Sequence, residues 1–151
     1  MLHYIAKNPK NTKVYQKMVE SCKYFFIKNP ILIISKLRYI HNGWETRVNE
    51  TWKSIDMNKI LCKLWITFEL RVVPENVNNT SVASAVVPKI YQCNFKRLLL
   101  CDQVISLKEH MILCSSVKEL RLERVIVKNE DCTLVTLEKL IEQLPKIKRI
   151  I

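Results

Sequence analysis

The stretch FKRLLLCDQVI, residues 95–105, decides the fold, because it returns 22 positions later as VKELRLERVIV, residues 117–127. When the two stretches are aligned at this offset, the apolar positions that define the pattern coincide. The matched pairs are Phe95 with Val117, Leu98 with Leu120, Leu100 with Leu122 and Val104 with Ile126. The alternation of apolar and polar residues around these anchors predicts a strand in each copy.

A helical pattern separates each copy from the next. Ser106 and Glu109 have the spacing of a capping box, which predicts a helix start with Leu107, Met111 and Cys114 on one side. After the second copy, a clearer amphipathic pattern runs to Pro145, with its apolar positions at Leu134, Leu137, Leu140, Ile141 and Leu144. A partial third copy begins at Ile147, 30 residues after Val117.

An LxxLxL strand followed by a helix is the unit of leucine-rich repeats, which have a period of about 20–29 residues. Each unit has an apolar side that it cannot bury alone, so that neighbouring units stack into one core. We therefore expect a mixed α/β fold with leucine-rich-type strand–helix units over residues 90–151. The alternative is an ordinary α/β domain whose strands resemble each other. A strand predicted from the alternation of residues 64–70 is a candidate for an earlier, diverged unit.

Strand alternation divides the repeat residues between two faces. Leu98, Leu100, Leu120 and Leu122 are expected to point inward. The outward set, which would meet a protein substrate, is Arg97, Leu99, Cys101, Glu119, Arg121 and Glu123. Its mixed charges suggest a polar protein partner.

The N-terminal part begins with a different pattern. Asn11 and Thr12 offer an N-cap, and apolar residues at three- and four-residue steps predict a helix to about Ile27. Asn29 and Pro30 end it, because the residue before a proline avoids the helical region. The β-branched residues 31–37 then predict a strand.

Composition limits the class of protein. The chain has 151 residues, 48% of them hydrophobic, with no apolar run of about 18 residues and no start typical of a secretory signal. Six scattered cysteines with mostly apolar neighbours are expected to be core thiols rather than disulfides. These features favour an intracellular protein, cytoplasmic or nuclear. A single glycine argues against P-loop and dinucleotide-binding folds.

No pattern of catalytic or metal-binding residues stands out. His3, His41 and His110 are far apart, and none has the spacing to Cys, Asp or Glu that a metal site requires. His110 is expected near the surface, the three tryptophans in or beside the core, and the acidic pair Glu130–Asp131 in a turn before a helix, where carboxylates suit the helix dipole. We therefore expect no enzyme, no metal and no cofactor.

The net charge of +11 is uneven. Residues 1–53 hold ten Lys and Arg against three Asp and Glu, whereas residues 54–151 hold fifteen against eleven. Because the N-terminal lysines are spaced singly, a solvated helical face is favoured over a nucleic-acid site, which remains the alternative.

Residues 14–34, VYQKMVESCKYFFIKNPILII, resemble the later part of the F-box-like region in a group of nematode F-box proteins. Cys22 and Lys23, followed by three aromatic residues, look like the Cys-Lys pair in an F-box helix that packs against the first helix of the domain. The nematode proteins commonly carry leucine-rich-type repeats after the F-box. The Leu-Pro dipeptide that usually opens an F-box does not precede this segment, where only residues 2–6, LHYIA, stand before the basic stretch, so that the start of the F-box is expected to be missing or degenerate.

The resemblance implies a substrate receptor of a Skp–cullin–F-box ubiquitin ligase. It divides the chain into an F-box-like helical region at 1–40, a connecting region at 41–89 and repeats at 90–151. It implies contacts to a Skp-type adaptor from Tyr15, Met18, Val19, Cys22 and Phe26. A free-standing repeat scaffold without adaptor binding is a further alternative.

Overall fold

The computed structural model describes residues 11–21, 30–144 and 146–151. These residues form a mixed α/β fold with one eight-stranded mixed sheet, one two-stranded sheet and four short α-helices. The elements are α2 (Thr12–Ser21), β1 (Ile31–Ile40), β2 (Gly43–Val48), β3 (Thr51–Ile55), β4 (Lys63–Val72), α4 (Val82–Val86), the 3₁₀ turn η1 (Val87–Lys89), β5 (Ile90–Cys93), β6 (Arg97–Cys101), β7 (Val104–Ser106), α5 (Leu107–Leu113), β8 (Glu119–Glu123), β9 (Ile126–Lys128), α6 (Leu137–Glu142) and β10 (Arg149–Ile150).

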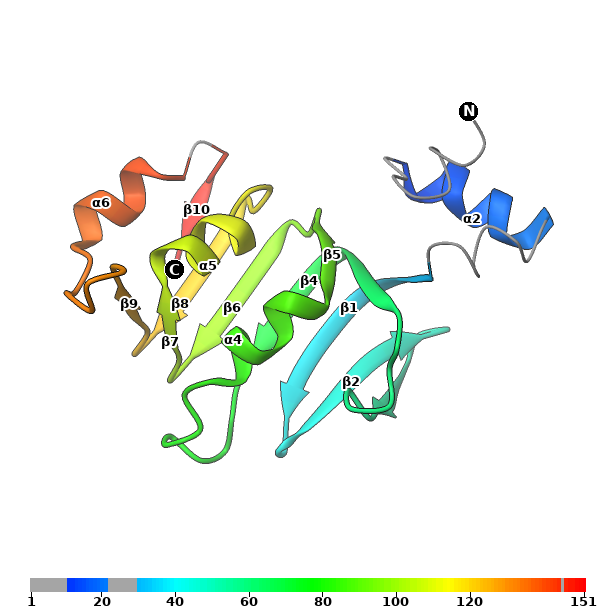
Figure 1. Cartoon of the computed structure of the whole chain (residues 1–151), viewed down its shortest axis with the longest axis horizontal. Helices are drawn as coiled ribbons and strands as arrows, with labels where there is room; N and C mark the ends of the chain where they lie inside the picture. Colours follow the sequence, from blue (N-terminus) through cyan, green and yellow to red (C-terminus); the bar gives the residue numbers. More distant parts are fainter. Residues whose placement is uncertain (1–10, 22–29, 145) are drawn as a thin grey trace.

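Parallel pairing dominates the main sheet. Its strand order is β10-β8-β6-β4-β1-β2-β3, and the five strands from β10 to β1 are parallel neighbours. The antiparallel strands β2 and β3 extend the β1 side, and β5 pairs with the first part of β4. Helices α4 and α5 lie over one face of the sheet, whereas α2 and α6 stand at opposite ends of the molecule (Figure 1).

The register of the parallel strands matches the predicted 22-residue offset. Leu98 pairs with Leu120 and Leu100 with Leu122 in β6 and β8, and β7 and β9 keep the same offset. The predicted third copy also pairs as expected, with Ile150 beside Leu120, and β4 joins the other side with Leu70 beside Leu98. The two copies of the repeated sequence therefore occupy equivalent positions in neighbouring parallel strands.

The core lies between these strands and the helices. Leu98, Leu100 and Leu120 are at most 2% exposed, and Leu122 is half-buried against the same cluster. The predicted inward set is thus confirmed, with Leu122 at its margin. Phe95 and Val117, the first anchors of the two copies, are fully buried.

The chain leaves β6 and β8 through two matching turns. Asp102 and Arg124, which are 22 positions apart, have positive φ angles of 53° and 50°. The Arg124 guanidinium donates to both Asp102 carboxylate oxygens, at 2.5 and 2.9 Å, and so ties one turn to the next. This ion pair lowers the pKa of Asp102.

Gln103, beside the first turn, is fully buried and fastens the loop before α4. Its Oε1 accepts from the Ala83 backbone N–H at 2.9 Å. Its Nε2 donates to the backbone carbonyls of Asn79, Cys101 and Asp102, at 3.0 to 3.2 Å. The amide therefore satisfies backbone groups from two segments that lie far apart in the sequence.

Neither a set of N-terminal helices nor a regular repeat solenoid is seen among the described residues. Helix α2 is capped by Asn11, whose Oδ1 accepts from the N–H groups of Lys13 and Val14. The helix spans Thr12–Ser21, and its predicted continuation to Ile27 lies outside the described residues. Residues 31–40, placed with the N-terminal region from the sequence, form β1 of the main sheet. Successive parallel strands are offset by unequal lengths, from 22 to 33 residues.

The helices between the strands follow the predicted caps but not all of the predicted faces. The capping box at Ser106 and Glu109 is confirmed. Of the side predicted for α5, Cys114 is buried and Leu107 is half-buried against the core, but Met111 is 48% exposed, and His110 and Leu113 are buried in addition. Helix α6 begins only at Leu137, so that Leu140 and Leu144 are buried while Leu134, Leu137 and Ile141 stay exposed. Short helices bury one or two positions, not a whole stripe.

Replacement of Gln103 by methionine is expected to lower the free energy of unfolding by about 3 kcal/mol, because it leaves buried backbone groups without partners. Urea unfolding measures this loss. The matched control Gln92→Met, at an exposed position of β5, should change stability by less than about 0.5 kcal/mol. Equal effects of the two substitutions would contradict the role of Gln103.

Candidate functional site

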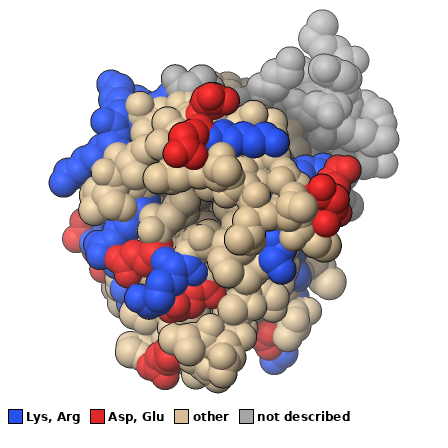
Figure 2. All heavy atoms as spheres, turned by 90° about the vertical axis from the view of Figure 1, so that its left-hand side faces the viewer, with Lys and Arg blue, Asp and Glu red and all other residues tan. Residues whose placement is uncertain are grey.

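The face of the main sheet opposite α4 and α5 presents the outward residues of its strands, and we name it the open face. Strand alternation places these residues opposite the core leucines. Figure 2 views the molecule from its α6 end and shows acidic and basic side chains interspersed on that surface. The charged members of the open face run across five neighbouring strands. They are Lys36, Arg38, Glu45, Glu69, Arg71, Arg97, Glu119, Arg121 and Glu123, with the apolar Leu99 among them.

Each glutamate of the open face is paired with an arginine. Arg97 of β6 reaches Glu119 of β8, with Nε 2.7 Å from Oε2, and so crosses the strand boundary that the 22-residue register creates. The other pairs are Arg38–Glu45, Arg71–Glu69 and Arg121–Glu123. Because these side chains remain partly exposed, each pair contributes little stability. The pairs instead direct each guanidinium group toward a carboxylate of the same face.

Aromatic rings lie beneath some of these cations. Lys36 Nζ lies 5.0 Å and the Arg97 guanidinium 5.3 Å from the centre of the Phe68 ring, and Arg38 stacks 3.7 Å above Trp52. Such cation–π contacts further restrict the cations. These contacts could not be predicted from the sequence, because they depend on which strands become neighbours.

The predicted substrate-binding residues lie together on this face, with one exception. Arg97, Glu119, Arg121 and Glu123 are accessible, and Leu99 is half-buried. Together with Glu69, Arg71 and Ile151, several of them line a hollow of about 180 Å³. The structure therefore brings most of the predicted set to one accessible surface.

The exception is Cys101, which is only 6% exposed, so that its predicted exposure is wrong. It pairs with Glu123 in the neighbouring strand, and its Sγ lies 3.6 Å from Glu123 Oε2. Burial, with Glu123 and Asp102 nearby, raises the thiol pKa to about 11. Alternation alone cannot anticipate that a neighbouring side chain covers an outward residue.

At the start of β4, a side chain that is outward by strand alternation is nevertheless buried. Trp65 is fully buried, packs with Tyr91 at a ring-centre distance of 5.4 Å, and its indole N–H has no partner among the described residues. Trp44 and Trp52 are half-buried. The expectation that tryptophans belong to the core or its edge is confirmed for Trp65 and for Trp44, which packs against the core cluster, whereas Trp52 lies under Arg38 on the open face.

The predicted adaptor-binding residues belong to α2 and to the segment after it, where the structure describes few side chains. Tyr15, Met18 and Val19 belong to α2, but their side chains are not described, and Cys22 and Phe26 lie outside the described residues. Val14, on the same predicted apolar stripe, is 50% exposed.

His110 is fully buried, so that its predicted place near the surface is wrong. The capping box sets the rotation of α5 and turns His110 inward, where Nδ1 lies 3.7 Å from Cys114 Sγ. Its Nε2 has no partner among the described residues, and burial lowers its pKa. The described residues contain no group of three side chains suited to hold a metal ion.

The cysteines divide between core and surface. Cys93 and Cys114 are buried, which raises the pKa of each thiol to about 12, and all five described cysteines are free. Cys132 is exposed, so that its prediction as a core thiol is wrong. It follows Asp131, whose carboxylate accepts from Thr133 N–H and Oγ1 in a turn that precedes α6.

In comparisons with known proteins, no family model, no curated protein and no solved structure matches this chain. Among the described residues, none of the helices has the length and apolar character needed to cross a bilayer.

The burial of His110 predicts a pH-dependent stability. Because its folded-state pKa lies below the ordinary value of 6.5, the unfolded chain binds the additional proton as the pH falls through 6.5. The free energy of unfolding should therefore be full at neutral pH and fall toward pH 5, by up to about 1.4 kcal/mol per pH unit from this group.

Urea unfolding of His110→Gln at both pH values measures this dependence. The variant should lose most of the difference in unfolding free energy between the two pH values, whatever its absolute stability. The control His41→Gln, at a 75% exposed side chain, should keep it. An unchanged difference in His110→Gln would show that another group causes the acid sensitivity.

Proposed function

We propose that this chain is a non-catalytic protein-binding module that presents its open face to a protein substrate. The observation that carries the proposal is the row of strands β4, β6 and β8, whose outward arginines and glutamates stand side by side in register. Ion pairs and aromatic rings restrain these side chains before a partner arrives, which reduces the entropy lost on binding.

We further propose that the module acts as a substrate receptor of a Skp–cullin–F-box ubiquitin ligase. Two features support this role. The segment around Cys22 and Lys23 resembles an F-box helix, and the in-register pair β6 and β8 with α5 between them fits leucine-rich-type units. In this proposal the apolar stripe of α2, with Tyr15, Met18 and Val19, meets the adaptor, and the open face meets the substrate. The site of action would be the cytoplasm or the nucleus.

Co-purification with a Skp-type adaptor tests the ligase proposal. The chain should retain the adaptor equally at low and high salt, because an apolar stripe makes the contact. The double variant Tyr15→Asp/Val19→Asp should lose the adaptor, whereas Lys13→Ala/Lys17→Ala, off the stripe on the same helix, should keep it. Absence of binding by the unmodified chain at both salt concentrations would contradict the ligase role.

A different outcome would favour the nucleic-acid alternative. Capture of RNA or DNA with an affinity that falls steeply with salt would indicate phosphate contacts by the basic side chains. If the chain binds neither the adaptor nor nucleic acid, the remaining candidate is a free-standing scaffold that binds proteins through the same open face.

A further inference from the structure

A lysine precedes each of three neighbouring parallel strands. Lys96 lies directly before β6, Lys118 before β8 and Lys148 before β10. Their backbones form one continuous ladder, since Lys118 N–H donates to the Lys96 carbonyl at 2.9 Å and Lys148 N–H donates to the Lys118 carbonyl at 2.8 Å. We name these three residues the lysine row. It arises from the same register that aligns the leucines.

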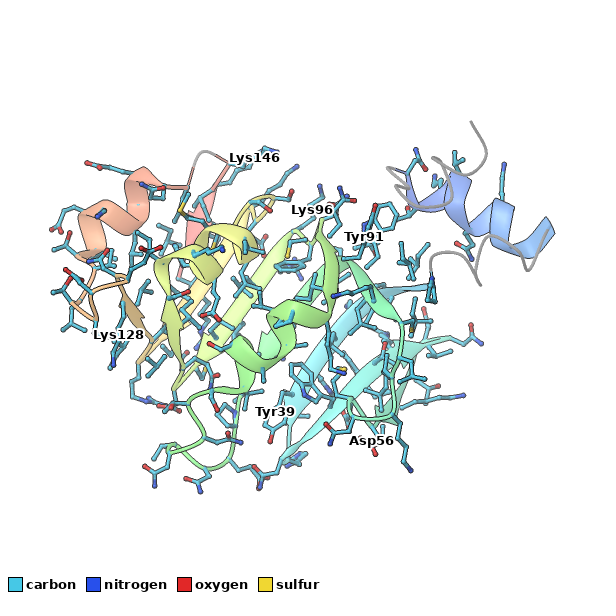
Figure 3. All side chains as sticks on the ribbon, in the orientation of Figure 1. Tyr39, Asp56, Tyr91, Lys96, Lys128 and Lys146 are labelled. Carbon is cyan, nitrogen blue, oxygen red and sulfur yellow. The ribbon has the colours of Figure 1, made fainter. Side chains whose placement is uncertain are left out.

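The lysine row is exposed and has no compensating charge. All three side chains are exposed, and none forms an ion pair with an acidic residue in the described part of the chain. Lys96 and Lys146 both project from the same edge of the molecule in Figure 3, so that Lys146 adds to the positive charge there. Glu119, which directly follows Lys118 in the sequence, is already paired with Arg97.

Such a row concentrates positive charge. Neighbouring strands are about 4.8 Å apart, so that the outer two lysines start about 10 Å from each other. Like charges at this spacing repel one another, and an anionic partner that neutralises them gains from each contact.

We propose that the lysine row binds a short acidic segment of a partner protein, at the edge from which the partner continues onto the open face. The inference rests on the proposed function of the chain as a protein-binding module. An extended peptide advances about 3.3 Å per residue, so three to four residues span the row. Carboxylates within such a segment can therefore meet all three ammonium groups.

The surroundings of the row favour a peptide over a nucleic acid. On strands β4, β6 and β8 of the adjoining open face, Arg71, Arg97 and Arg121 are each paired with a glutamate, so that a phosphate backbone continuing past the lysines meets no surplus of positive charge there. A polypeptide can place basic or neutral residues there instead. Three lysines also supply few of the phosphate contacts from which nucleic-acid affinity is built.

Fluorescence anisotropy with labelled hexaglutamate and the full chain tests the proposal. Exposed ion pairs contribute little individually, so each single change Lys96→Gln, Lys118→Gln or Lys148→Gln should weaken binding about two- to fivefold. The triple variant should weaken it about tenfold or more. The matched control replaces the exposed Lys53, Lys59 and Lys108 by glutamine, which removes the same charge elsewhere, and should cost less than about twofold.

Three outcomes would overturn the proposal. They are no binding of hexaglutamate by the unmodified chain, equal weakening by both triple variants, and tighter binding of hexauridylate than of hexaglutamate. The last result would assign the row to nucleic acid. Loss of adaptor capture, by contrast, would contradict the ligase role and leave the peptide result untouched, so that the two failures are distinguishable.

Discussion

The in-register parallel pairing of β6 with β8 is the constraint on which the rest of the structure depends. With Leu98 beside Leu120 and Leu100 beside Leu122, the leucines of both strands face the same core. A shift by one residue would turn them toward solvent and bury the arginines and glutamates. The same pairing places Arg97 against Glu119. Core, open face and lysine row are therefore three consequences of one register.

Much of this register could be predicted from the sequence, because it depends on local periodicity and on repetition. The 22-residue offset, the partial third copy and the capping box at Ser106 are each visible as patterns of a few residues, and the structure confirms them. The outward position of Arg97, Glu119, Arg121 and Glu123 follows from alternation once the strands are assigned. These features need no knowledge of which distant segments meet.

The remaining features depend on tertiary contacts that a single sequence does not reveal. Cys101 is outward by alternation but is covered by its cross-strand neighbour, and His110 is polar yet turned inward by the cap of its own helix. The role of Gln103 could not be predicted, since two of its partners, Asn79 and Ala83, lie about 20 or more residues away, at and before the start of α4. The pairing of β1 with β4, which places Lys36 over the Phe68 ring, has a longer and irregular offset.

The most direct measurement of the central register uses the native Cys101 and the single substitution Glu123→Cys. Adjacent positions on paired strands lie within the Cα separation that a disulfide requires, and Cys101 Sγ already contacts the Glu123 side chain. Mild oxidation followed by peptide mass spectrometry should detect a bond between Cys101 and the introduced thiol at position 123, and should detect none in the control Arg121→Cys. A bond to position 121 instead, or equal bonding at both positions, would contradict the pairing from which the open face is derived.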